Sequence, residues 1–206
     1  LKDDSFVSIV EAVKQGRIIF GNIRKFIIYQ LSYHLSEILV IASISFTIFE
    51  LPLLPLQLLF LNLLSDIFPA LALGIGHGNQ RVMEHPPKNP DEPILNKMHW
   101  FSIGVFGIIL TLFVDGAYLF ARYHWELSPD LCNNVAFFSL AFAQLWHVFD
   151  MRESNEPVFI NQITKNKYVW MALGVCSAIL LTAYFVPGLN EILSFQYMEG
   201  RVWLLI

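Results

Sequence analysis

The sequence predicts an all-α integral membrane protein, a bundle of about six transmembrane helices whose last member is truncated, with a cytoplasmic stalk helix at the N-terminus. Of the 206 residues, 55% are hydrophobic and only 15% are charged, whereas a soluble domain has about 25% charged residues. The hydrophobic residues form runs long enough to cross the roughly 30 Å hydrocarbon layer of a bilayer. We therefore expect a multi-pass protein in contact with lipid, and no nucleic-acid partner.

The first 25 residues predict a helix in water. Their apolar positions follow helical spacing at Phe6, Ile9, Val10 and Val13. Helical character continues past Gly16 and Gly21 into the first apolar run. We expect one continuous stalk that can carry motion from a soluble domain into the membrane.

Five complete apolar runs and the beginning of a sixth follow this stalk. They cover residues 26–49, 53–75, 100–120, 133–150, 168–186 and 202–206. The sixth run is cut off by the end of the chain, which predicts a fragment of a longer protein. Its expected parts are a stalk segment at 1–25 and a membrane domain at 26–206.

The basic residues predict the orientation of the runs. Of the 13 Lys and Arg residues, all except Arg122 and Arg201 fall in the N-terminal segment, in the loop after the second run or in the loop after the fourth. Loops rich in Lys and Arg remain in the cytoplasm. The N-terminus and these two loops are therefore expected on the cytoplasmic side.

Polar residues interrupt the second run, LQLLFLNLLSDIFPALALG. Asn62, Ser65 and Asp66 share one helix face because they are separated by three and four positions. An Asp at membrane depth costs about 2.5–3.5 kcal/mol on insertion scales, so it usually has a function. Pro69 lacks the N–H that would bond the Ser65 carbonyl, which frees another oxygen. Calcium and magnesium prefer such oxygen ligands; the alternative is a hydrogen-bonded patch between helices.

The first run has a polar stripe of its own. Gln30, Tyr33, His34 and Glu37 lie on one face of an otherwise apolar helix. Glu37 is read either as a proton relay or as a buried hydrogen-bonded acid, and His34 either as a structural hydrogen-bonding residue or as a ligand. A short loop joins the first two runs, so their polar faces can meet. Gln144 in the fourth run is also expected to face the bundle.

Other polar residues in the runs have simpler interpretations. Asp115 lies near the outer end of the third run and is expected to be satisfied by water or by Arg122, seven residues later. Cys132 and Cys176 are expected to be packing residues and not a disulfide or a metal pair. The sequence contains neither GxxxxGK[ST] nor GxGxxG after a strand. Chemistry that drives transport must therefore lie outside this chain.

Three stretches together resemble the C-terminal part of P-type cation-transporting ATPases, most closely the calcium-pump branch. LKDDSFVSIVEAVKQGRIIFGNIRKFI is similar to the end of the phosphorylation domain and its stalk, LPLQLLFLNLLSDIFPALALG to the sixth membrane helix, and VMEHPPKNPDEPIL to the following loop. The resemblance covers practically the whole chain. It implies that the phosphorylated Asp of DKTGT, the nucleotide domain and four helices, with ATP and magnesium, belong to a missing N-terminal part of the same pump.

The resemblance also implies individual ligands. Asn62 and Asp66 match the sixth-helix Asn and Asp that the family places between two cation positions, and Ser65 stands where reticulum-type calcium pumps have Thr. Glu37 matches the fifth-helix Glu of the two-ion pumps. Asp66 and Asn62 are therefore the expected principal metal ligands, Glu37 and Ser65 the supporting ones, and Gln144 a weaker candidate.

Two residues depart from the family pattern. His34 replaces the usual Asn, and Gln144 stands where the eighth helix of two-ion pumps has Glu. The first ion position thus loses an acid and gains a group that can become cationic. A pump for protons or a monovalent cation is for this reason the alternative to a calcium pump.

An alternative that is not an enzyme is a free-standing membrane subunit or channel-like protein without ATPase activity. The leading interpretation is the C-terminal membrane domain of an ATP-hydrolysing ion pump that transports calcium. Its short loops favour a compact bacterial pump in the plasma membrane.

Overall fold

The computed structural model describes residues 6–48, 50–76, 82–84, 86, 93–153 and 156–206, with the exception of the Asp66 side chain. Three of the basic residues counted in predicting the orientation lie outside this described part: Lys2, Arg81 and Lys88. Most of the loop VMEHPPKNPDEPIL lies outside it as well.

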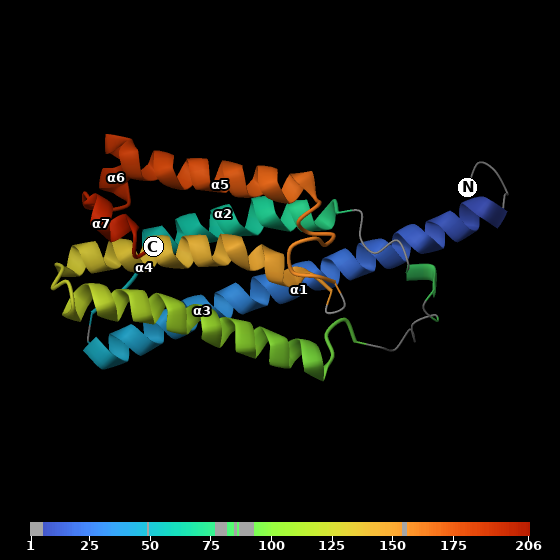
Figure 1. The fold of residues 1–206 in the computed structure, drawn as a ribbon, viewed down its shortest axis with the longest axis horizontal. Helices are drawn as coiled ribbons and strands as arrows, with labels where there is room; N and C mark the ends of the chain where they lie inside the picture. The colour runs from blue at the N-terminus through green and yellow to red at the C-terminus, as the bar shows by residue number, and fades with distance from the viewer. Residues whose placement is uncertain (1–5, 49, 77–81, 85, 87–92, 154–155) are drawn as a thin grey trace.

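A single long helix, α1 (Phe6–Ile48), confirms the prediction that the stalk continues into the first apolar run. At 1.5 Å per residue its 43 residues extend over about 65 Å. This is about twice the thickness of the hydrocarbon layer, and the N-terminal part of α1 projects from the bundle (Figure 1). Inside the bundle, the Ser32 and Ser36 hydroxyls donate to the carbonyls of Ile28 and Tyr33 on the same helix, so these polar groups need no water.

Three more helices are, like α1, long and apolar enough to cross a membrane: α2 (Pro55–Gly74), α3 (Lys97–Tyr123) and α5 (Lys167–Phe185). Their first residues follow ordinary capping rules. Pro55 begins α2 at a position where no N–H is required. The Asn96 and Asn166 side chains accept hydrogen bonds from backbone N–H groups in the first turns of α3 and α5.

The fourth predicted run, 133–150, corresponds to α4 (Pro129–His147) and the 3₁₀ helix η2 (Val148–Met151). This helix is not among the four apolar ones. Its polar residues lower its hydropathy, and they are tolerated because they are buried against protein: Asn133, Asn134, Ser139 and Gln144. Figure 1 shows α4 between α2 and α3, in the middle of the bundle.

Three short helices complete the described chain: η1 (Val82–Glu84), α6 (Pro187–Ile192) and α7 (Gly200–Trp203). The predicted sixth run, 202–206, enters the structure only as the end of the four-residue α7 and the turn that follows it.

The helices are antiparallel, and their ends separate the basic residues as the sequence predicts. The end of α2, η1, the start of α3 and the segment between α4 and α5 lie at the end of the bundle from which α1 projects (Figure 1). Lys97, Arg152 and Lys167 are at this end, whereas Arg122 is near the last turn of α3 and Arg201 is in α7, at the opposite end. The assignment of the first end to the cytoplasm stays a prediction.

Amide side chains close the opposite end of the bundle. The Gln57 amide nitrogen, on α2, donates to Asn133 Oδ1 on α4 at 2.7 Å and to the Leu193 carbonyl at 3.0 Å. Asn133 in turn donates to the Pro52 carbonyl at 2.8 Å. Both amides are buried and paired, so this cluster joins the α1–α2 connection, α4 and the segment after α6 without buried charge.

The structure corrects one suggested pairing. Arg122 forms an ion pair with Glu50 at 3.0 Å, and the Tyr118 hydroxyl donates to the same carboxylate at 2.7 Å. Asp115 is not the acid that Arg122 contacts, and its Oδ1 is buried with no hydrogen-bond partner among the described residues. Arg122 therefore pairs with Glu50, in the connection between α1 and α2, and not with Asp115.

Cys132 and Cys176 are both free and buried, which confirms that they do not form a disulfide. The Cys176 thiol lies 3.8 Å from the Leu64 carbonyl on α2. This thiol thus packs α5 against the part of α2 that carries Ser65.

Gly107 of α3 packs closely against α1. Among the described glycines, it is the one where an added Cβ atom would have the nearest neighbour. A Cβ atom at Gly107 would lie 2.8 Å from Leu35 Cδ2, whereas one at Gly104 would meet nothing within 4 Å. We expect Gly107→Ala to destabilise the protein by about 1–3 kcal/mol through overpacking. Gly104→Ala, its matched control one turn earlier, should have an unfolding temperature no lower than that of the wild type, because Ala is the better helix former.

The measurement is thermal unfolding of both full-length variants in detergent. Equal unfolding temperatures for the two variants would show that the Leu35 contact does not limit the packing.

Candidate cation site

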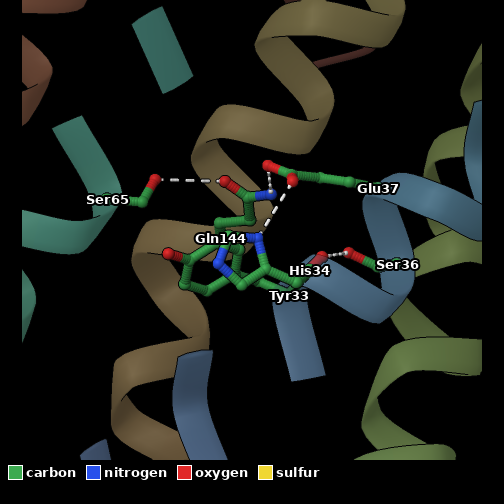
Figure 2. A network of polar contacts seen from close by, with 6 residues as sticks. All are labelled: Tyr33, His34, Ser36, Glu37, Ser65 and Gln144. Carbon is green, nitrogen blue, oxygen red and sulfur yellow. Dashed lines mark hydrogen bonds and ion pairs between the residues drawn. The ribbon is translucent and has the colours of Figure 1, made fainter. Parts of the chain in front are cut away.

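The Glu37 carboxylate is the centre of a polar cluster between α1, α2 and α4. Glu37 lies on the buried side of α1, and only 6% of its surface is exposed. The Gln144 amide nitrogen donates to Glu37 Oε1 at 3.1 Å, and His34 Nδ1 lies 3.3 Å from Glu37 Oε2. Figure 2 shows both side chains directed at the carboxylate, Gln144 from α4 and His34 from the preceding turn of α1.

Gln144 connects this carboxylate to α2. Its amide oxygen accepts a hydrogen bond from the Ser65 hydroxyl at 3.1 Å (Figure 2). Gln144 is completely buried and Ser65 is 1% exposed. A buried glutamine with both ends of its amide bonded is held in one orientation, so the distance between Glu37 and Ser65 is set by Gln144.

Asn62, on α2, also lies close to Glu37. One terminal atom of its amide lies 3.0 Å from Glu37 Oε1 and 3.2 Å from Glu37 Oε2. If this atom is nitrogen, it donates to both carboxylate oxygens. This orientation satisfies both side chains, since an amide oxygen at this place would face two carboxylate oxygens with no donor between them. A half-turn of the amide would direct its oxygen at the carboxylate, the arrangement that a bound cation could bridge.

Asp66 belongs to α2 by its backbone, and its side chain lies outside the described part of the structure. Asp66 follows the buried Ser65 directly and comes four residues after Asn62. Pro69 lies inside α2, so the Ser65 carbonyl lacks its usual N–H donor. The role of Asp66 as a ligand therefore stays a prediction.

The end of α2 nearest the stalk is anchored by two asparagines. The Asn22 amide, on the stalk part of α1, donates to the Gly76 carbonyl at 2.8 Å, and the Asn166 amide donates to the Ala72 carbonyl at 2.9 Å. These bonds satisfy carbonyls that the end of a helix leaves without partners. They also tie α2 to the stalk and to the start of α5.

The structure thus brings together four of the five predicted ligands: Asn62, Glu37, Ser65 and Gln144. It also places His34, for which the sequence left two roles, in contact with Glu37 through Nδ1. The sequence analysis missed Tyr29, whose hydroxyl donates to the Gln144 carbonyl at 3.2 Å. No sequence pattern could have identified this contact, because the two residues are 115 positions apart.

The chemistry of the cluster suits a hard cation. Within the described residues no group of three His, Cys, Asp or Glu side chains is positioned to hold a metal. The cluster contains instead one carboxylate, two amides and one hydroxyl, groups whose oxygens calcium accepts as ligands, although the Gln144 amide turns its nitrogen to Glu37 and its oxygen to Ser65.

The sequence is similar to those of known cation-transporting ATPases. The sequence model of the family described as "Cation transporting ATPase, C-terminus" matches residues 50–206. The calcium-transporting ATPase of Bacillus subtilis (strain 168) is 35% identical over 206 residues, which is 100% of this chain and 23% of that protein. The calcium-transporting ATPase 1 of Lactococcus lactis subsp. lactis (strain IL1403) is 36% identical over 203 residues, covering 97% of this chain and 22% of the relative.

A plant protein is similar at a greater distance. The plasma membrane-type calcium-transporting ATPase 8 of Arabidopsis thaliana is 26% identical over 210 residues, covering 98% of this chain and 19% of that protein. The chain thus spans about a quarter or less of the length of these relatives. With a family match over most of its length and a helical membrane bundle, the chain belongs to the family of the C-terminal region of cation-transporting ATPases.

Proposed function

We propose that this chain is the membrane region of an ATP-driven cation pump and that it contributes the transmembrane cation site, with calcium as the transported ion. The observation that carries the proposal is the meeting of Asn62 and Glu37. One Asn62 amide atom lies within 3.2 Å of both carboxylate oxygens, so the partly buried amide on α2 and the buried Glu37 on α1 are close enough to share one ion when the amide turns its oxygen toward the carboxylate. Calcium is favoured because the ligands are oxygens and because the relatives are named calcium-transporting ATPases.

The long α1 helix supplies a route by which ATP hydrolysis can act on this site. Glu37 and His34 lie on the same continuous helix as the projecting stalk. A movement of α1 therefore changes the position of Glu37 relative to Ser65 on α2. In this proposal the ATP, the magnesium and the phosphorylated residue belong to the part of the pump that precedes the chain. Its stalk connection is the segment 1–25.

One specific contact favours a second candidate function. His34 Nδ1 lies 3.3 Å from Glu37 Oε2, so a protonated His34 places a positive charge where a second cation would otherwise bind. This arrangement suits a pump for protons or a monovalent cation. The channel-like alternative has no comparable support, because the relatives over practically the whole chain are named ATPases.

The test is phosphorylation of the full-length protein from ATP in the presence of different ions. We expect calcium between about 10⁻⁷ and 10⁻³ M, the concentrations at which natural calcium sensors and extracellular sites bind, to stimulate phosphoenzyme formation. Sodium, potassium and protons at matched ionic strength are the controls. Stimulation by a monovalent ion or by acid, with no effect of calcium, would contradict the calcium assignment and select the second candidate.

A further inference from the structure

Gln144 is held in place by an interaction outside the candidate cation site. Gln144 lies near the end of α4, where the helix changes into the 3₁₀ helix η2. The Val148 N–H, which would bond the Gln144 carbonyl in a regular α-helix, bonds the carbonyls of Leu145 and Trp146 instead. The tighter winding therefore releases the Gln144 carbonyl inside the bundle.

The released Gln144 carbonyl accepts a hydrogen bond from Tyr29. Its hydroxyl donates to the Gln144 carbonyl at 3.2 Å, and its side chain is completely buried. Tyr29 lies on α1 two turns before Glu37, so the same helix holds the Gln144 backbone at one point and receives the Gln144 amide at another. Gln144 is thus attached to α1 at both its main chain and its side chain.

The His147 ring supports Tyr29. The two rings are stacked with centroids 5.8 Å apart and an interplanar angle of 19°. Phe106 of α3 packs against the same imidazole at 4.8 Å. His147 Nδ1 lies 2.9 Å from Asp150 Oδ2, which fixes the plane of the ring. Because His147 is only 2% exposed, its ring is a buried aromatic group that packs between Tyr29 of α1 and Phe106 of α3.

We propose that Tyr29, supported by the His147 ring, is a positioning residue that fixes the Gln144 amide between Glu37 and Ser65. This inference rests on the proposed function, and it assigns a role to two residues outside the cation ligands. A shift of α1 then moves Gln144 through Tyr29, so Glu37 and Gln144 move together. Without the Tyr29 hydroxyl, the Gln144 main chain loses this attachment, and the position of its amide between Glu37 and Ser65 is less firmly held.

The experiment is equilibrium binding of radiolabelled calcium to the full-length protein in detergent, with single and double variants. We expect Tyr29→Phe to weaken calcium binding by about 3- to 10-fold, the range of one hydrogen bond, without lowering the amount bound at saturation. In a Gln144→Ala background the same change should have no further effect, because the amide that Tyr29 positions is gone.

Two controls separate positioning from general packing. Tyr118→Phe removes a hydroxyl at the far end of the bundle, where it donates to Glu50, and should leave calcium affinity unchanged. His147→Phe keeps a ring beside Tyr29 and should retain wild-type affinity, whereas His147→Ala should match Tyr29→Phe.

Three outcomes overturn the inference. Tyr29→Phe with the affinity of Tyr118→Phe shows that the hydroxyl is not needed. An equal loss with and without Gln144 shows that Tyr29 does not act through this amide. If the wild-type protein binds no calcium at all while remaining folded, the proposed function fails and this inference with it.

Discussion

Glu37→Gln in the full-length protein is expected to lower the apparent calcium affinity by about 100-fold or more while phosphorylation at saturating calcium stays measurable. Glu37 is the described carboxylate on which Asn62, His34 and Gln144 converge. Removing one partner from a buried charged pair costs about 3–5 kcal/mol, and 1.4 kcal/mol corresponds to a factor of ten. The glutamine retains one oxygen, so binding is weakened and not abolished.

Calcium titrations of phosphoenzyme at fixed pH measure this effect. Glu50→Gln is the matched control: it makes the same chemical change in a carboxylate that pairs with Arg122 and Tyr118 at the far end of the bundle. It should leave the titration midpoint unchanged. If both variants shift the midpoint equally, the loss comes from general destabilisation and the central role of Glu37 is wrong.

The helices were largely predictable because their causes are local. The absence of proline between Phe6 and Ile48 allows α1 to continue as one helix, and the apolar runs set the length of α2, α3 and α5. For α4, hydropathy is a weaker guide. Its Asn133 and Asn134 are buried by other parts of the protein and paired with them, so α4 is accommodated by tertiary contacts that no local window contains.

The candidate site was predictable as a set of residues but not as a geometry. Helical spacing places Asn62 and Ser65 on one face of α2, and it places His34 and Glu37 on one face of α1. Nothing in the spacing shows that Gln144 joins these two faces, since it is 107 residues from Glu37 and 79 from Ser65. The sequence therefore ranked Gln144 as the weakest ligand, whereas the structure makes it the bridge between α1 and α2.

The relative importance of the two acids, Asp66 and Glu37, is also not predictable from the sequence alone. The sequence favours Asp66 over Glu37, on the basis of the Pro69 break and the family resemblance. In the described structure Glu37 contacts two of the other predicted ligands, Asn62 and Gln144, and His34 as well. Because the Asp66 side chain lies outside the described part of the structure, a direct comparison of variants of the two carboxylates is needed to rank them.

Asp66→Asn is expected to abolish calcium-dependent phosphorylation from ATP at every calcium concentration tested. Glu37 provides one negative charge, and a desolvated divalent cation with a single carboxylate keeps an uncompensated charge, which is costly to bury. Asp66 is the acid on α2 nearest in sequence to Asn62 and Ser65, and the family resemblance implies that both cation positions share it. Asparagine keeps an oxygen at this position but removes the charge.

The comparison uses phosphoenzyme titrations of Asp66→Asn beside Glu37→Gln, with Asp115→Asn as the control. Asp115 lies in α3, which contributes none of the predicted ligands, so its neutralisation should leave calcium dependence intact. If Glu37→Gln is inactive and Asp66→Asn keeps near-normal affinity, the site is centred on α1. The contact between His34 and Glu37 at 3.3 Å then makes proton transfer along α1 the better account of transport.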